Sequence, residues 1–248
     1  MRRRVTVAPY IVPKGRVKSF SAPLMVPTKW VKFIVALFLL PICAILSQTF
    51  FTSFARATVS ERLWAGVEFW FFSLGAVLWL IAFFGLPRPI VLYVFGHELT
   101  HALWVWLMGG RVSRFKVGRE GGHILTDKNN FLIALAPYFF PLYAVMVVAF
   151  FCVGNWFWRW QPYMVWFHLL LGASYGFHLT LTWHILKSSQ SDITEQGYLF
   201  SAVVIFLGNA VILLLAIPLL TGRVPVLGAL RWWGEDTVLV WRFLGVRF

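Results

Sequence analysis

The chain contains 248 residues, of which 60% are hydrophobic, 19% are aromatic and only 12% are charged. A mean hydropathy of +0.76 exceeds what a water-soluble domain of this size needs, so the composition indicates a polytopic membrane protein. The formal net charge of +13 comes from cations spread over the N-terminal arm, the short loops and the tail, which is typical of contacts with anionic lipid. We therefore expect the lipid bilayer, and no nucleic acid, as a partner.

Six long apolar stretches follow one another along the chain, each with at most one charged residue. Each stretch is long enough for the roughly 20 helical residues that cross a bilayer. They lie at residues 33–55, 63–86, 89–110, 131–158, 160–186 and 197–222. We predict six membrane-spanning helices in one compact bundle.

This pattern divides the chain into three regions. Residues 1–32 form a basic N-terminal arm, residues 33–222 form the six-span membrane domain, and residues 223–248 form an interfacial tail that mixes Trp and Arg. If both termini lie in the cytoplasm, more Lys and Arg lie on the inner side than on the outer side, in agreement with the positive-inside rule. We predict a multi-pass integral membrane protein of the cell (inner) membrane.

The third apolar stretch contains the sequence Gly96-His97-Glu98-Leu99-Thr100-His101, an HExxH signature. Residues four apart lie on one face of a helix, so the imidazoles of His97 and His101 can bind one metal ion while Glu98 holds a water molecule. The His and Glu content of the chain predicts this pattern only about 0.004 times by chance. Ionisable groups at membrane depth are costly and usually face a cavity, a partner or a metal ion. We predict that His97 and His101 bind zinc and that Glu98 is the catalytic base.

The segment 111–127, directly after the motif, predicts a β-hairpin. Phe115 and Val117 alternate with polar residues, a glycine-rich turn follows at 118–122, and His123-Ile124-Leu125 begins a return strand. A hairpin is marginally stable alone, so we expect it to lie against the bundle. An open strand edge could pair with an extended substrate, and an ordinary surface hairpin explains the pattern equally well. The predicted fold class is an all-α polytopic membrane bundle of about six transmembrane helices with a small β-hairpin after the HExxH helix.

Catalytic zinc usually takes three protein ligands, so one ligand remains to be found. The loop 187–196 returns to the side of the bilayer where the HExxH helix ends, and it contains Asp192 and Glu195. His184, near the end of the preceding span, is another candidate, and His178 lies deeper in that span. We favour Asp192, because an oxygen ligand at the start of the last span could reach a site just below the interface. The Asp-x-x-Glu pattern is also typical of a helix cap that needs no metal.

An HExxH motif inside a transmembrane helix, a Gly-Gly exit, a hairpin and a distal Asp together resemble the site-2 protease family of intramembrane zinc metallopeptidases. The resemblance covers residues 89–209, about half of the chain, and its HExxH part is the most specific. It implies a peptidase domain at 33–222 that hydrolyses membrane-spanning or membrane-proximal protein substrates, with one Zn²⁺ per chain. It also implies His97, His101 and Asp192 as zinc ligands and Glu98 as the catalytic base. Family members normally carry Gly after the distal Asp, where this chain has Ile193.

Two other classes of protein compete with this interpretation. A membrane zinc peptidase of the HtpX or prenyl-protein type also places HExxH near a bilayer, with a Glu as third ligand, for which Glu195 is the candidate. A non-catalytic membrane scaffold or chaperone could retain the motif without using it. The intact Glu98 argues against the scaffold, because loss of that one residue would abolish the chemistry and leave the fold.

Overall fold

The computed structural model describes residues 28–59, 62–119, 121–221 and 226–243, so most of the predicted basic arm lies outside the described residues. These ranges form a mostly helical bundle with one small antiparallel sheet. The helices are α1 (Thr28–Val59), α2 (Val67–Gly85), α3 (Ile90–Leu107), α4 (Phe131–Leu135), α5 (Leu142–Trp158), α6 (Met164–Leu186), α7 (Ser191–Gln196), α8 (Tyr198–Thr221) and α9 (Val226–Phe243). The strands are β1 (Val112–Gly118) and β2 (Gly121–Thr126), and 3₁₀ turns lie at η1 (Leu63–Ala65), η2 (Ala136–Tyr138) and η3 (Gln161–Tyr163).

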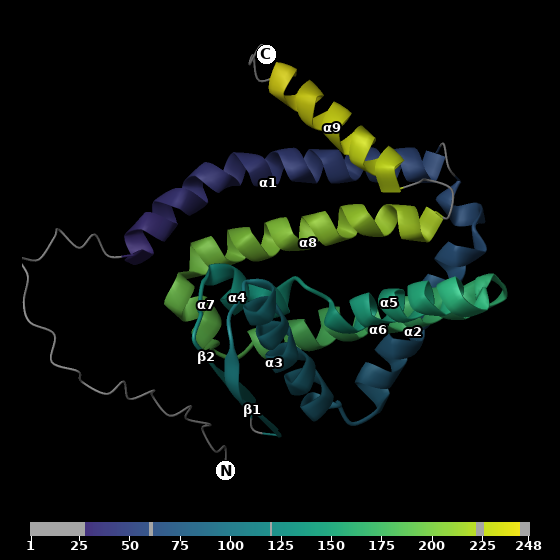
Figure 1. Ribbon diagram of the computed structural model, residues 1–248. Coiled ribbons are helices and arrows are strands. Elements are labelled where there is room, and N and C mark those ends of the chain that lie inside the picture. Colours follow the sequence, from purple (N-terminus) through teal and green to yellow (C-terminus); the bar gives the residue numbers. More distant parts are fainter. Residues whose placement is uncertain (1–27, 60–61, 120, 222–225, 244–248) are drawn as a thin grey trace, which may run out of the picture.

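The long helices form two layers (Figure 1). In one layer α1 runs beside α8, and α9 packs against α1. In the other layer α6 packs against both α2 and α5. The helix α3, the hairpin, α4 and α7 gather at one end of the bundle, where α3 contacts both strands and α4 contacts α7. This end brings together the HExxH helix and the loop that follows α6.

Five of the described helices are long and apolar enough to cross a membrane: α1, α2, α3, α6 with its preceding turn η3, and α8. The predicted fourth span, 131–158, is not one straight helix, because α4 with η2 and α5 meet at an angle of 82°. Pro137 and Pro141 account for this break, since neither has the backbone N–H that a continuous helix requires. Counted as one span, the bent pair raises the number of candidate spans to six.

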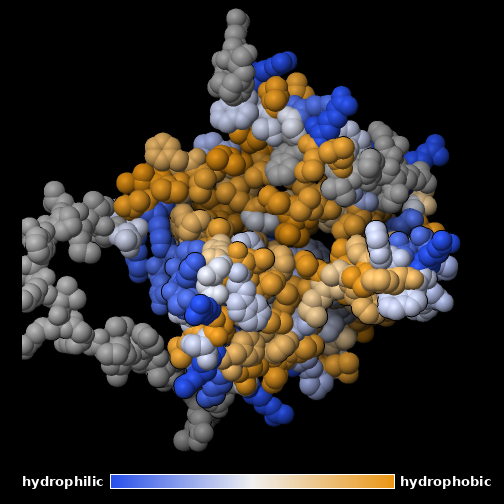
Figure 2. Space-filling view, viewed as in Figure 1, coloured by the Kyte–Doolittle hydropathy of each residue, from blue (hydrophilic) through white to orange (hydrophobic). Residues whose placement is uncertain are grey.

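Large apolar side chains cover the outside of the bundle. Phe38 on α1 is 77% exposed, Phe84 on α2 is 79% exposed, and Trp156 on α5 is 84% exposed. Figure 2 shows apolar side chains over most of one face, with hydrophilic side chains at the end that carries α7 and at the opposite end. A water-soluble monomer rarely exposes apolar patches of this extent, so the surface agrees with the predicted membrane protein.

The hairpin prediction is confirmed. β1 and β2 pair antiparallel, with Gly118 opposite Gly121 and Phe115 opposite Ile124. At the chain ends, α1 begins at Thr28, within the predicted arm, and the predicted tail 223–248 contains α9. The hairpin therefore lies directly after the HExxH helix, as the alternation of residues indicated.

Two glycines allow the backbones of α2 and α6 to touch. A Cβ atom on Gly75 would lie 1.9 Å from the carbonyl oxygen of Leu169, and one on Gly172 would lie 1.9 Å from the carbonyl oxygen of Phe72. Backbone atoms cannot give way as the end of a flexible side chain can. The close packing of these two helices therefore depends on both residues being glycine.

We expect Gly75→Ala to lower the free energy of unfolding by about 1–3 kcal/mol, because the added methyl group must push α2 away from α6. Thermal unfolding of the detergent-solubilised chain measures this change. Gly85→Ala is the matched control on the same helix, because a Cβ at Gly85 meets no atom within 4 Å. Equal melting temperatures for the two variants would contradict the prediction.

Candidate metal centre

The helix α3 carries both histidines of the motif. It ends where Gly109 adopts a positive φ of 69°, and the N–H of Gly110 donates to the carbonyl oxygen of Val105 at 2.8 Å. This is a glycine-dependent helix end, and it turns the chain into β1. His97 and His101 lie one turn apart on the buried side of α3, facing away from the exposed surface.

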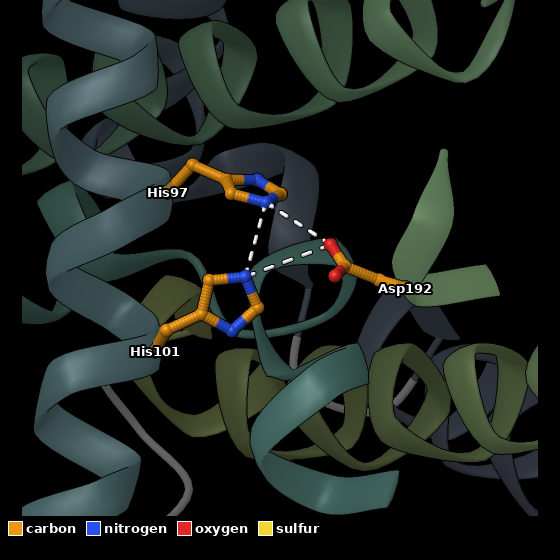
Figure 3. Close-up of side chains that lie close together, drawn as sticks. All are labelled: His97, His101 and Asp192. Carbon is orange, nitrogen blue, oxygen red and sulfur yellow. Dashed lines mark hydrogen bonds and ion pairs between the residues drawn. The ribbon is translucent and has the colours of Figure 1, made fainter. Parts of the chain in front are cut away.

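Figure 3 shows His97 and His101 from α3 and Asp192 from α7 pointing toward one another. The Nε2 atoms of the two imidazoles are 3.2 Å apart. The Oδ2 atom of Asp192 lies 3.4 Å from Nε2 of His97 and 3.6 Å from Nε2 of His101. Two segments separated by more than ninety residues therefore bring three possible ligand atoms to one point.

The three separations fit a small metal ion. Ligand atoms about 2.0–2.1 Å from a tetrahedral ion lie about 3.3 Å from one another, and the observed 3.2, 3.4 and 3.6 Å are close to that value. The atoms thus outline one face of a tetrahedron, and the fourth corner is left for a water molecule or a substrate. His97, His101 and Asp192 form a group that can hold a metal ion.

A backbone carbonyl orients His101. Nδ1 of His101 donates to the carbonyl oxygen of Ile133 at 2.7 Å, because a carbonyl can only accept. In a straight helix that carbonyl would accept the N–H of residue 137, but Pro137 has none. The proline therefore frees the carbonyl for His101. The proton on Nδ1 leaves the lone pair of Nε2 available to a metal ion, an arrangement usual for metal-binding histidines.

Asp192 lies on the short helix α7 and not on α8, the spanning helix that the sequence led us to expect. The N-cap of α7 is Gln190, with no side-chain capping bond, so Asp192 does not act as the cap. Its Oδ2 atom accepts a hydrogen bond of 3.0 Å from the hydroxyl of Tyr138. Ile193, the residue after it, packs against the apolar core between α1, η2 and α8 and thereby anchors α7.

The environment of Asp192 favours its charged form. Burial raises the pKa of this carboxyl, but the imidazoles of His101 and His97 lower it by more, so the pKa lies well below its ordinary value. An ionised carboxylate is the form that binds metal ions. The hydroxyl of Tyr138 supports the same form, because it donates to the carboxylate oxygen.

Glu98 is buried beside the two histidines, under β2. A Cβ on Gly122 would lie 2.6 Å from Cγ of Glu98 and 2.9 Å from Cγ1 of Val94, so only glycine lets β2 approach α3 this closely. Glu98, His97, His101 and Asp192 all line one cavity of about 800 Å³. Its other walls come from β2, α4 and the segment between α6 and α7, so the loop 187–196 lies on the side where the HExxH helix ends, as expected.

The other predicted ligands do not join this group. Among the described residues, Glu195 is exposed and lines the same cavity, and neither it nor His184 belongs to the group that could hold a metal ion. His178 is buried and lines a smaller cavity that His97 also lines. Sequence reasoning missed Tyr138 and the carbonyl of Ile133. The carbonyl had a usable signal, because Pro137 lies four residues after it.

Comparisons of the chain with protein-family models, with curated proteins and with solved structures found no match. The residues and their geometry define a candidate metal centre inside a helical bundle of the membrane type.

Proposed function

We propose that the chain is an intramembrane zinc metalloprotease, similar to site-2 proteases, with six spans when the bent pair at 131–158 counts as one. The observation that carries the proposal is a single cavity lined by a buried glutamate and by three residues that could bind one metal ion. The glutamate and the two histidines lie on α3, a helix apolar enough to span a membrane. His97, His101 and Asp192 are the zinc ligands, and Glu98 is the catalytic base. Two nitrogens and one carboxylate oxygen with an open fourth position are typical of catalytic zinc.

A bound zinc ion would supply Lewis acidity, which polarises a peptide carbonyl and lowers the pKa of a water molecule. Glu98 accepts the proton of the attacking water and passes it to the leaving amine. Glu98 lines the same cavity as the three proposed zinc ligands. His101 is held in one orientation by the carbonyl of Ile133, and Asp192 is held by Tyr138. No covalent intermediate with the protein is needed.

The substrate class is a membrane-spanning or membrane-proximal protein segment. Several residues of β2 line the cavity. β1 pairs with one edge of β2. An extended segment that pairs with the free edge of β2 would pass along the cavity with its peptide bonds near the metal ligands. A transmembrane substrate is helical in lipid, so local unwinding must precede this pairing.

The proposal is tested by removing the metal. We expect the purified chain to contain about one zinc ion and, in liposomes, to cleave at least one member of a panel of end-labelled single-span membrane proteins. Treatment with 1,10-phenanthroline should abolish the new fragments, and stoichiometric Zn²⁺ should restore them, because the catalytic water depends on the metal. A folded chain that binds no zinc, or cleavage that persists after the metal is removed, would refute the assignment.

A further inference from the structure

The second ring nitrogen of His97 is buried without a partner. Nε2 of His97 faces Asp192 and His101, so Nδ1 lies on the opposite side of the ring, away from the proposed ion (Figure 3). Among the described residues, Nδ1 has no hydrogen-bond partner. Metal-binding histidines almost always donate this second N–H to a carboxylate, a carbonyl or a water molecule. His101 follows that rule through Ile133, and His97 has no such protein acceptor in the described part of the chain.

A second, smaller cavity is also lined by His97. It measures about 20 Å³, lies between α3, η2 with the start of α5, and α6, and is separate from the large cavity that contains Asp192. A cavity needs roughly 10–15 Å³ to hold one water molecule, together with two or more polar groups to bind it. This one has the volume for a single water molecule.

The polar groups around the small cavity are also present. His178, on α6, is only 7% exposed, and its Nε2 atom has no hydrogen-bond partner among the described residues. The hydroxyl of Tyr93, whose ring contacts that of His97 with centroids 5.9 Å apart, is likewise buried, and the side chain of Thr182 lies near it. His97, Tyr93 and His178 all line this cavity. Three buried polar groups thus surround a space of one water molecule.

We propose that His178 is a positioning residue for the metal ligand His97 and acts through one water molecule held in this cavity. The Nδ1–H group of His97 donates to the water, and the water donates to Nε2 of His178 and to the Tyr93 hydroxyl oxygen. This arrangement protonates Nδ1, so the lone pair of Nε2 stays directed at the metal. This inference rests on the proposed metal centre. It adds a residue from α6 that orients a metal ligand without contacting the ion.

The experiment measures metal affinity and needs no substrate. Zn²⁺ affinity of the full chain in detergent is determined by competition with a chromophoric chelator, and the visible spectrum of bound Co²⁺ reports the ligand geometry. We expect His178→Leu to weaken Zn²⁺ binding by about 10–100-fold, the usual effect of losing an outer-shell partner, and to alter the Co²⁺ spectrum. His178→Met serves as a second apolar variant if the first does not fold. His178→Gln retains an acceptor and should recover most of the affinity.

His168→Leu is the matched control. His168 is another buried histidine on α6, about 15 Å away along the helix, and its ring nitrogens lie beside the carbonyl oxygens of Met164 and Leu219. This variant should lose stability but retain full Zn²⁺ affinity. If the His178 variants bind Zn²⁺ as tightly as the unaltered chain, the positioning role is wrong while the proposed protease stands. If the unaltered chain binds no Zn²⁺, both proposals fail.

Discussion

Replacing Glu98 by Gln is expected to lower the rate of proteolysis by about 10²–10⁴-fold and to leave the zinc content of the purified chain unchanged. The amide has nearly the same size as the carboxylate and fits under Gly122 in the same way, but it cannot accept a proton from water. Cleavage of a labelled single-span substrate in liposomes, together with metal analysis of the same preparation, measures both effects.

Glu195→Gln is the matched control for this experiment. Glu195 lines the same cavity but is exposed and does not belong to the group that could hold a metal ion. The control should retain activity within a few fold of the unaltered chain. Full activity of the Glu98→Gln variant would end the protease proposal, whereas loss of zinc in that variant would show that Glu98 has a structural role.

Asp192→Ala is expected to weaken zinc binding by more than about 100-fold, because loss of a direct ligand should exceed the usual effect of losing an outer-shell partner. The large loss has a second cause. Without Asp192, the hydroxyl of Tyr138 and the two imidazoles lose the carboxylate that they face. Asp192→Asn keeps an oxygen atom without the charge, so its zinc affinity should fall between those of the unaltered chain and Asp192→Ala. Competition with a chelator measures all three.

Two further variants separate Asp192 from the other ligands considered. Glu195 lies on the same short helix as Asp192, and the zinc affinity of Glu195→Ala should match that of the unaltered chain. His184→Ala should also leave the affinity unchanged, since His184 does not belong to the group that could hold a metal ion. Unchanged affinity in Asp192→Ala, with a loss in either of the other two, would move the third ligand to that residue.

Local patterns predicted the central part of the site. The His97–His101 pair depends only on helical periodicity, and the hairpin depends on alternation and a glycine-rich turn, so each can be recognised within a few residues. Asp192 required one non-local argument, namely that the loop 187–196 returns to the side where α3 ends. Between these two points the chain crosses the bilayer once and returns once, so it ends on the same side of the membrane however the helices pack.

Other features could not be predicted from local patterns. Tyr138 contacts Asp192 only because the chain bends at 139–141, and apolar composition alone indicates a straight span there. The sequence pattern also did not show that α7 is separate from α8. Gly197, with a positive φ of 93°, ends α7 one residue before α8 begins. His97 on α3 and His178 on α6 line one small cavity, and this depends on packing between distant segments. Periodicity within one helix carries no information about such contacts.

The break between α4 and α5 has a consequence for how this chain can vary. Pro137 and Pro141 interrupt the helix in the predicted fourth span, and the missing N–H of Pro137 also leaves the carbonyl of Ile133 free to hold His101. A residue with an N–H at 137 would favour a longer helix and would compete with the imidazole for the same oxygen. We therefore expect a variant that gains a regular helix in this segment to hold His101 less firmly and to bind metal more weakly at the proposed centre.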